Sequence, residues 1–286
     1  MSPVSTLMTV LADGQFHSGT ELGQAMGCTR SAVWKVIHLL QDSGIEIYSV
    51  RGKGYRLSSQ IELLESEKII SCLDPNLKQL LQGIDVHFEL ASTNAHLLES
   101  VSTGNASGVV CLAERQTSGR GRRGRTWVSP FGGNLYLSLL WRFAGGASQL
   151  AGLSLAMAIA IVRALREFGL DSVTVKWPND ILVSDRKLAG ILLELSGEAS
   201  GPCSVVIGFG LNIRAPAAAM STIDQPWTDL ESELGRSVAR NELAGRLINH
   251  LLSSIQEFEQ DGLAPFLNEW QAHDSFAGKE VILHMP

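Results

Sequence analysis

Residues Gly119–Gly124 read GRGRRG, and their types suggest a site for anions. Three of the six are arginine, and Arg125 follows directly. Glycines let the backbone come close to a ligand, and guanidinium groups bind phosphate or carboxylate through two parallel hydrogen bonds. The glycine spacing also matches G-x-G-x-x-G, the fingerprint of dinucleotide-binding turns. The stretch is therefore a dinucleotide turn, another kind of anion site, or a solvated basic loop.

The surrounding sequence excludes the dinucleotide turn. Such a turn leads from a strand directly into a helix, and an acidic residue about 20 positions later binds the ribose. Here the loop runs on to 134–141, NLYLSLLW, which predicts a strand where the dinucleotide turn would need a helix. Between Glu114 and Glu167 there is no acidic residue, while eight arginines fall in that interval. Because Trp127 and Phe131 follow the glycines, we expect a basic loop that folds over a ligand rather than a solvated one.

Two basic and polar segments downstream could complete such a site. VTVKWPND, at 173–180, predicts a strand that places Lys176, Asn179 and Asp180 at its end, where functional residues often lie. RKLAGILLEL, at 186–195, predicts a buried strand that begins beside Lys187. IGFGLNI, a third predicted strand, carries glycines that allow close approach to a ligand. Ordinary hairpin chemistry is the alternative explanation of each segment alone.

The first sixty residues have a different character. Ser18 and Glu21 have the spacing of a helix capping box, and Thr29 can cap a second helix after a turn at Gly27. After Gly44, IEIYSVRGKGYRL predicts two strands around a glycine turn. Helices followed by a basic hairpin are typical of a winged helix-turn-helix, which places a helix in the major groove of DNA and the wing against phosphates. The exposed residues expected to bind DNA are Arg30, Ser31, Trp34, Lys35, Arg51 and Lys53.

A small helical interaction domain is the alternative for this region, because residues 1–57 hold five Lys/Arg against four acidic residues. A surplus of one positive charge is weak support for DNA binding. The bases, however, lie together on the helix face and at the wing tip, which favours a local DNA-binding patch.

The composition of the 286 residues is that of an ordinary globular protein, with 45% hydrophobic and 18% charged residues. A net charge of −6 excludes a generally basic nucleic-acid coat. No basic signal-peptide region opens the chain, and the apolar run 150–162 is shorter than the roughly 20 residues that a membrane helix needs. We therefore predict a cytoplasmic protein with no membrane partner.

The cysteines and histidines give no sign of a metal site in the sequence. Cys28, Cys72, Cys111 and Cys203 lie far apart and form no C-x-x-C pair, which argues against a disulfide framework and a zinc knuckle. The seven histidines are scattered and form no H-x-x-x-H pair, so surface or core positions are expected for them.

Taken together and in this order, ERQTSGRGRRGRTW, KWPNDI, RKLAGILLE and IGFGLNI behind a winged helix resemble the biotin–protein ligases, of the kind that also represses the biotin operon. The resemblance covers essentially the whole chain. It implies an α+β fold with a winged helix-turn-helix at 1–62 and a mixed-sheet α/β catalytic domain of the biotin/lipoate ligase type at 63–272. It also implies that 273–286 begins a truncated SH3-like C-terminal barrel, with a strand from Glu280.

In that family biotin and ATP form biotinyl-5′-adenylate and pyrophosphate, and the adenylate acylates a lysine of biotin carboxyl carrier protein. The resemblance implies that the catalytic residues are Lys187, Arg120, Arg122 and Asp180. It implies that biotin contacts Ser92, Thr93, Asn94, Gln116, Gly119, Arg120, Arg122, Lys187, Gly190 and Gly208. It implies that ATP or the adenylate contacts Arg122, Arg125, Trp127, Lys176, Asn179 and Asn212.

The resemblance leaves some roles open. Asp180 could hold Mg²⁺, or it could position or deprotonate the acceptor lysine. The segment Ser92–Asn94 is also a helix N-cap pattern, which is compatible with binding biotin. A reactive adenylate must be shielded from water, and both the arginine–glycine loop and 215–227 could act as lids. The family couples such ordering to homodimerisation on operator DNA when the adenylate is bound, and we expect the same here.

Two other classes compete with this assignment. A lipoate–protein ligase has the same reaction type and catalytic fold, but its R-R-x-x-G-G-G-x-V-x-H-D signature is absent. A transcription factor whose second domain only senses a metabolite would not need the full set of charge-neutralising residues, namely Arg120, Arg122, Lys176, Lys187 and Asp180. The sequence therefore favours a biotin ligase with a repressor domain.

Overall fold

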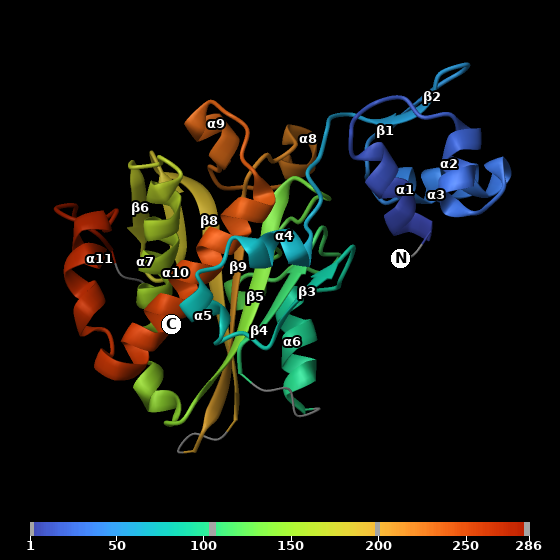
Figure 1. Cartoon of the computed structure of the whole chain (residues 1–286). Coiled ribbons are helices and arrows are strands. Elements are labelled where there is room, and N and C mark those ends of the chain that lie inside the picture. The colour runs from blue at the N-terminus through green and yellow to red at the C-terminus, as the bar shows by residue number, and fades with distance from the viewer. Residues whose placement is uncertain (1–2, 103–106, 198–200, 283–286) are drawn as a thin grey trace.

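The computed structural model describes residues 3–102, 107–197 and 201–282, which form a small N-terminal domain and a larger α/β domain (Figure 1). The small domain consists of three helices and a two-stranded antiparallel wing. Its elements are α1 (Pro3–Leu11), α2 (Gly19–Met26), α3 (Arg30–Asp42), β1 (Ile47–Val50) and β2 (Gly54–Leu57). This arrangement confirms the winged helix-turn-helix that the sequence predicts.

Local chemistry sets the helix boundaries of the small domain. The Ser18 hydroxyl accepts a hydrogen bond from the amide of Glu21 at 3.1 Å, and Thr29 accepts one from the amide of Ala32 at 3.3 Å. Gly27 ends α2 with a φ of 64°, a left-handed conformation that glycine adopts without a steric penalty. Leucines, isoleucine and valine from all three helices pack with the wing into a separate core, which fixes the direction of α3.

The larger domain is built on a seven-stranded mixed sheet in the order β3-β4-β5-β9-β8-β7-β6. Only β3 and β4 are parallel, and every other neighbouring pair in the sheet is antiparallel. The strands are β3 (Gly83–His87), β4 (Val109–Ala113), β5 (Asn134–Phe143), β6 (Val173–Lys176), β7 (Asp180–Val183), β8 (Arg186–Gly197) and β9 (Cys203–Asn212). The strands predicted from the sequence around the candidate site are all present.

Helices cover both faces of this sheet (Figure 1). On one face α7 and α10 pack over the main core together with α4. On the other face α6 packs against β4, β5 and β9 over a smaller apolar cluster. The helices of the larger domain are α4 (Ser66–Ser71), α5 (Pro75–Lys78), α6 (Thr93–Ser102), α7 (Leu153–Glu167), α8 (Ala217–Met220), α9 (Leu230–Leu234), α10 (Arg240–Asp261) and α11 (Leu267–His273).

One helical stretch, Ala147–Glu167, is long and apolar enough by length and composition to cross a membrane. In its most apolar window 61% of the residues are buried inside the domain. It contains α7, whose leucines, isoleucines and alanines contact the sheet and α10. This helix therefore serves as a core helix of the larger domain.

The segment between the two domains is fixed by a buried ion pair. Arg240 and Glu114, whose side chains are 5% and 4% exposed, lie 2.8 Å apart. Arg240 also donates to the backbone oxygen of Glu62 at 2.7 Å, and the Glu62 carboxylate accepts from Asn241 at 2.8 Å. The residues that leave the small domain are therefore tied to the start of α10 and to the end of β4.

The strand expected from Glu280 falls only partly on described residues. Residues 280–282 form no strand, and 283–286 lie outside the described residues. The SH3-like barrel at 273–286 and the three domain boundaries stay predictions.

Candidate functional site

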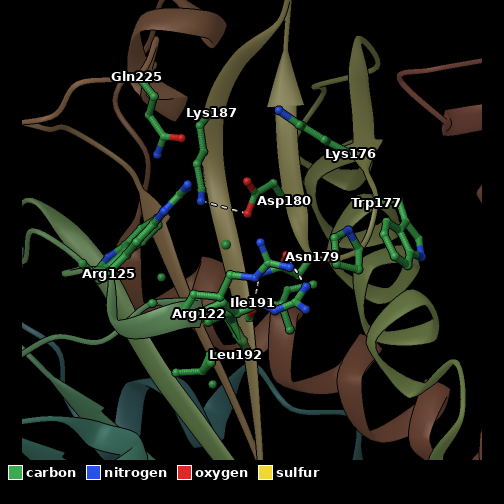
Figure 2. A pocket seen from close by; sticks show the side chains of 18 of the residues that line it. Arg122, Arg125, Lys176, Trp177, Asn179, Asp180, Lys187, Ile191, Leu192 and Gln225 are labelled. Carbon is green, nitrogen blue, oxygen red and sulfur yellow. Dashed lines mark hydrogen bonds and ion pairs between the residues drawn. The ribbon is translucent and has the colours of Figure 1, made fainter. Parts of the chain in front are cut away.

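A pocket of about 870 Å³ opens over β7, β8 and β9, at the end of the sheet where β7 begins (Figure 2). Its volume lies within the range of small-molecule sites. The N-terminus of α6, the loop between β4 and β5, and the turn between β6 and β7 form its walls. Segments distant in the sequence thus supply the polar side chains of one cavity.

Lys187 and Asp180 form the central charged pair of the pocket. The Lys187 Nζ and an Asp180 carboxylate oxygen lie 2.8 Å apart, and the two side chains are only 15% and 20% exposed. A register shift at Ile181/Leu182 in the β7–β8 pairing lets both side chains face the pocket. The ammonium also lies 5.4 Å from the centre of the Trp127 ring, within cation–π range. The Lys187 ammonium is therefore held by both the Asp180 carboxylate and the Trp127 ring.

The arginine–glycine loop folds into a small hairpin over the pocket. The amide of Gly121 donates to the oxygen of Arg125 at 2.7 Å, and the amide of Trp127 donates to the oxygen of Gly119 at 2.9 Å. A 3₁₀ turn spans Arg122–Gly124 at its tip. This geometry presents several guanidinium groups from one short loop.

The turn between β6 and β7 holds one of these arginines. Arg122 donates to the side-chain oxygen of Asn179 at 3.0 Å (Figure 2). Asn179 is fixed in turn by two hydrogen bonds with the backbone of Ile191, at 2.8 and 2.9 Å. Arg120 lies 3.5 Å from the Glu194 carboxylate. The loop is thus positioned by the strands beneath it.

Three strand glycines leave room for the side chains above them. A Cβ on Gly208 would lie 1.9 Å from Asn94 Oδ1, and one on Gly210 would lie 2.3 Å from the Trp127 ring. At Gly190 the nearest atom, also on Trp127, would be 3.1 Å away. Glycine is therefore required at 208 and 210 for close approach, whereas at 190 an added Cβ would only be tightly packed.

A hydrogen-bonded network lines the opposite end of the pocket, at the start of α6. The backbone amide of Thr93 donates to the Gln116 side chain at 2.9 Å, and Asn94 donates to Glu194 at 2.8 Å. Ser138 Oγ lies 2.7 Å from Thr93 Oγ1 and 2.5 Å from Asn94 Oδ1. These buried amides and hydroxyls form a polar end suited to a neutral hydrogen-bonding ring system.

Most of the residues expected in the site line this one pocket, which brings together the stretches that the sequence singled out. Two do not. Gly119 is absent from the pocket lining, and a Cβ there would meet the Trp127 oxygen at 2.5 Å, so glycine is needed for the loop fold while its contact with biotin stays a prediction. Asn212 is 2% exposed and bonds to Asn134 and Thr228, which places it in the scaffold. Among the described residues Asn212 does not line the pocket, and its expected contact with the nucleotide stays a prediction.

Sequence reasoning missed several residues of the site. Ser138 does not line the pocket but is buried behind it, where it bonds to Thr93 and Asn94, and a lone serine in an apolar strand was the available signal. The missed lining residues include Trp177 and Gln225, which lie within 173–180 and 215–227 but were given no role, and Trp270 and Phe276, which no motif marked. The segment expected to act as a lid, 215–227, contains the short helix α8 and ends against β8. There the amide of Lys187 donates to the oxygen of Pro226, and the amide of Thr228 donates to the oxygen of Lys187, both at 2.9 Å.

The second candidate site is the surface of α3 and the wing. The six residues expected to contact DNA are all exposed, and none of the four basic ones has an ion-pair partner in the described parts of the chain. Trp34 is 52% exposed and packs edge-on against His38, with ring centroids 4.2 Å apart. A cationic and aromatic face of this kind suits a polyanion.

Known protein families match both the larger domain and the small N-terminal domain. Residues 89–212 match the biotin/lipoate A/B protein ligase family, and residues 4–56 match an HTH domain family. Bifunctional ligase/repressor BirA of Salmonella typhimurium is 45% identical over 278 residues, which cover 97% of this chain and 84% of that protein. Its Escherichia coli counterpart is 44% identical over 277 residues, with the same coverage.

Solved structures give the same result. Biotin protein ligase from Aquifex aeolicus in complex with biotin and ATP superposes with a TM-score of 0.58 at 26% identity, over 68% of this chain and 80% of that one. Fold and pocket thus define a protein ligase of the biotin/lipoate class joined to a helix-turn-helix domain. Within that class, the chain belongs to the family of bifunctional ligase/repressors.

Proposed function

We propose that this chain is an ATP-dependent biotin–protein ligase that also acts as a biotin-responsive repressor of the biotin operon. It forms biotinyl-5′-adenylate and transfers biotin to a lysine of biotin carboxyl carrier protein in the cytoplasm. The observation that carries this proposal is the convergence of Lys187, Asp180 and the arginine loop on one pocket with the polar end at Ser92–Asn94. The family membership supports the same activity.

The first half-reaction brings two anions together. The biotin carboxylate attacks the α-phosphorus of ATP, a P–O bond forms, and pyrophosphate leaves. Lys187, Arg120 and Arg122 supply positive charge where these groups meet, and preorganised charge of this kind lowers the barrier. The network at Thr93, Asn94 and Gln116 would hold the ureido ring at the other end. Arg125, Trp127 and Lys176 would contact the nucleotide.

In the second half-reaction the amine of the acceptor lysine attacks the acyl carbon, and AMP leaves. The amine must lose a proton, and Asp180 is the pocket carboxylate nearest to the charged centre that the structure identifies. Asp180 also positions Lys187 before this step. We therefore assign Asp180 both roles, with proton acceptance available once Lys187 turns toward the adenylate.

Mg²⁺ fits this pocket only in company with the nucleotide. Mg²⁺ in nucleotide sites is held by one or two carboxylates, by substrate phosphates and by water. Asp180 is the carboxylate that would contribute, and one of its oxygens already contacts Lys187. Bound with ATP, the ion would neutralise charge on the phosphates.

The repressor activity would use the exposed face of α3 and the wing. Ser31, Trp34 and the adjacent bases Arg30 and Lys35 would meet base edges and phosphates in the major groove, while Arg51 and Lys53 at the wing would contact phosphates. We propose that adenylate binding promotes a homodimer that binds the operator. Sedimentation of the chain with and without biotin and ATP measures that step.

The test of the proposed catalysis is biotin-dependent exchange of labelled pyrophosphate into ATP. Exchange that requires biotin, ignores lipoate and falls in Lys187→Ala is expected. Surface Lys78→Ala serves as the matched control, because Lys78 is exposed on α5, away from the pocket lining. Exchange with lipoate instead would identify a lipoate ligase. Biotin binding without exchange would identify a metabolite sensor.

A further inference from the structure

The face of the sheet covered by α6 carries a cluster of possible metal ligands away from the ligase pocket. His87 on β3, His96 on α6 and Cys111 on β4 offer ligand atoms that all lie within 4.8 Å of one another. Their positions in the sequence gave no metal-binding motif. The parallel pairing of β3 with β4 and the packing of α6 on that sheet face bring them together (Figure 1).

One atom of the cluster has an unexplained environment. The Nε2 of His87 is buried and has no hydrogen-bond partner among the described residues. Buried nitrogens without a partner are rare in native proteins, and an ion is one of the standard explanations. The rings of His87 and His96 lie edge to face with centroids 4.7 Å apart, so the two imidazoles are direct neighbours.

The chemistry of the donor set is that of zinc. Two imidazoles and a thiolate are the ligands that Zn²⁺ prefers, and a fourth position is commonly filled by carboxylate or water. Asp85 is paired with Cys111 in the β3–β4 ladder, so it lies on the same face of the sheet. Tetrahedral zinc needs ligand atoms about 3.5 Å apart, so small side-chain rotations would close the cluster.

Burial acts in opposite directions on the protonation of two of these ligands. Burial lowers the pKa of His87, and the neighbouring His96 lowers it further, which keeps the imidazole neutral and able to bind a metal. Burial raises the pKa of Cys111 to about 12, so a metal must displace the thiol proton, and this works against binding.

We propose that His87, His96 and Cys111 form a zinc-binding site, with Asp85 or a water as the fourth ligand. Binding replaces the thiol proton with a Zn–S bond and releases that proton to solvent. The metal would join β3, β4 and α6. His87 and His96 also flank 88–95, the segment that carries Ser92, Thr93 and Asn94, so the zinc site would brace the polar end of the pocket.

The experiment uses the full chain without a histidine tag, treated with a chelator and then titrated with Zn²⁺ and, separately, with Co²⁺. One equivalent of tightly bound metal is expected. Bound Co²⁺ should show the near-ultraviolet charge-transfer band of a thiolate ligand. The Cys111→Ser variant should lose that band.

A second variant keeps the test valid if Cys111→Ser fails to fold. His96 is partly exposed on α6, and His96→Gln should weaken zinc binding at least about 10-fold, since even loss of an outer-shell partner costs 10–100-fold. The matched controls are Cys72→Ser and His250→Gln, which lie outside the cluster and should bind metal as the unmodified chain does.

Hydrogen exchange locates the metal. Zinc should slow exchange at 87–96 and around Cys111 in the unmodified chain, and not in His96→Gln. Substoichiometric binding, binding that His96→Gln leaves unchanged, a cobalt spectrum without the thiolate band, or protection confined to other segments would overturn the proposal. None of these measurements depends on ligase activity.

Discussion

The ligase pocket and the face of α3 both gather positive charge, but they hold it differently. In the pocket, Lys187 is paired with Asp180 at 2.8 Å, and Arg122 is held by Asn179 at 3.0 Å. On the small domain, Lys35 and Arg51 are exposed, without ion-pair partners in the described chain. The pocket thus fixes Lys187 and Arg122 before the ligand arrives, whereas the small domain leaves Lys35 and Arg51 in solvent.

This difference corresponds to two physical tasks. A transition state gains from charges already oriented, because little reorganisation is then needed when the reaction occurs. A surface that meets a long polyanion gains from many exposed charges that release counterions, an effect that is strongly salt-dependent. Catalysis in this chain should therefore depend on geometry, and DNA binding should depend on ionic strength.

The largest effect is expected from Lys187→Ala. Removing one preorganised charge from a reacting centre lowers kcat by about 100- to 1,000-fold. Pyrophosphate exchange at saturating biotin and ATP measures the loss. Lys78→Ala should retain full exchange. If Lys187→Ala kept more than a tenth of the activity, the pocket would not be organised around this charge.

Gly210→Ala tests geometry without changing charge. The added methyl would lie 2.3 Å from the Trp127 ring, so the ring and Lys187 beneath it must shift. Overpacking of this kind costs about 1–3 kcal/mol, which is about a 5- to 150-fold loss in affinity or rate. Kd values for biotin and ATP by calorimetry would check it, with Gly83→Ala as the control, because an added Cβ there meets no atom within 4 Å. Unchanged affinities would show that Trp127 is mobile.

The DNA-binding face should respond to salt. Arg51→Ala with Lys53→Ala removes two wing charges, and each lost phosphate contact reduces the slope of log K against log salt by about 1. A slope smaller by about 2, with pyrophosphate exchange unaffected, is expected for the double variant. Titrations of operator DNA at several salt concentrations give the slope. A fall in affinity with the slope unchanged would argue for base contacts at the wing instead.

The smallest effect concerns pH in the small domain. Burial disfavours the charged form of His17, yet hydrogen bonds with Glu21 at 2.8 Å and Asp13 at 3.0 Å outweigh it and raise its pKa above the usual 6.5. The stabilisation is therefore complete below pH 6.5 and is lost as pH rises through the raised pKa. NMR titration of His17 would show a raised pKa in the unmodified chain and a lower one in Asp13→Asn. Equal pKa values in the two chains would show that the contact with Asp13 does not raise the pKa of His17.

The sequence predicted those features that depend on contacts between residues close together in the chain. Ser18, Thr29 and Gly27 fix helix ends through neighbours a few residues away, so the sequence predicted those boundaries correctly. The hydrogen bond of Ser138 with Asn94 joins residues 44 apart and had no motif to predict it. Asn212 lies on the same face of β9 as the pocket glycines, but its side-chain amide donates to the backbone oxygen of Thr228. That contact depends on tertiary packing, so the sequence did not predict it.

The buried arginine at the start of α10 also has a practical consequence for anyone dividing this protein. Glu62, which the sequence assigned to the DNA-binding domain, bonds to Arg240 and Asn241 of the larger domain. A fragment that begins at Leu63 would keep the guanidinium and lose these acceptors. Fragments of the larger domain should therefore begin at or before Ser58, because Ser59, Gln60 and Glu62 bond to Arg214, Arg240 and Asn241 of that domain.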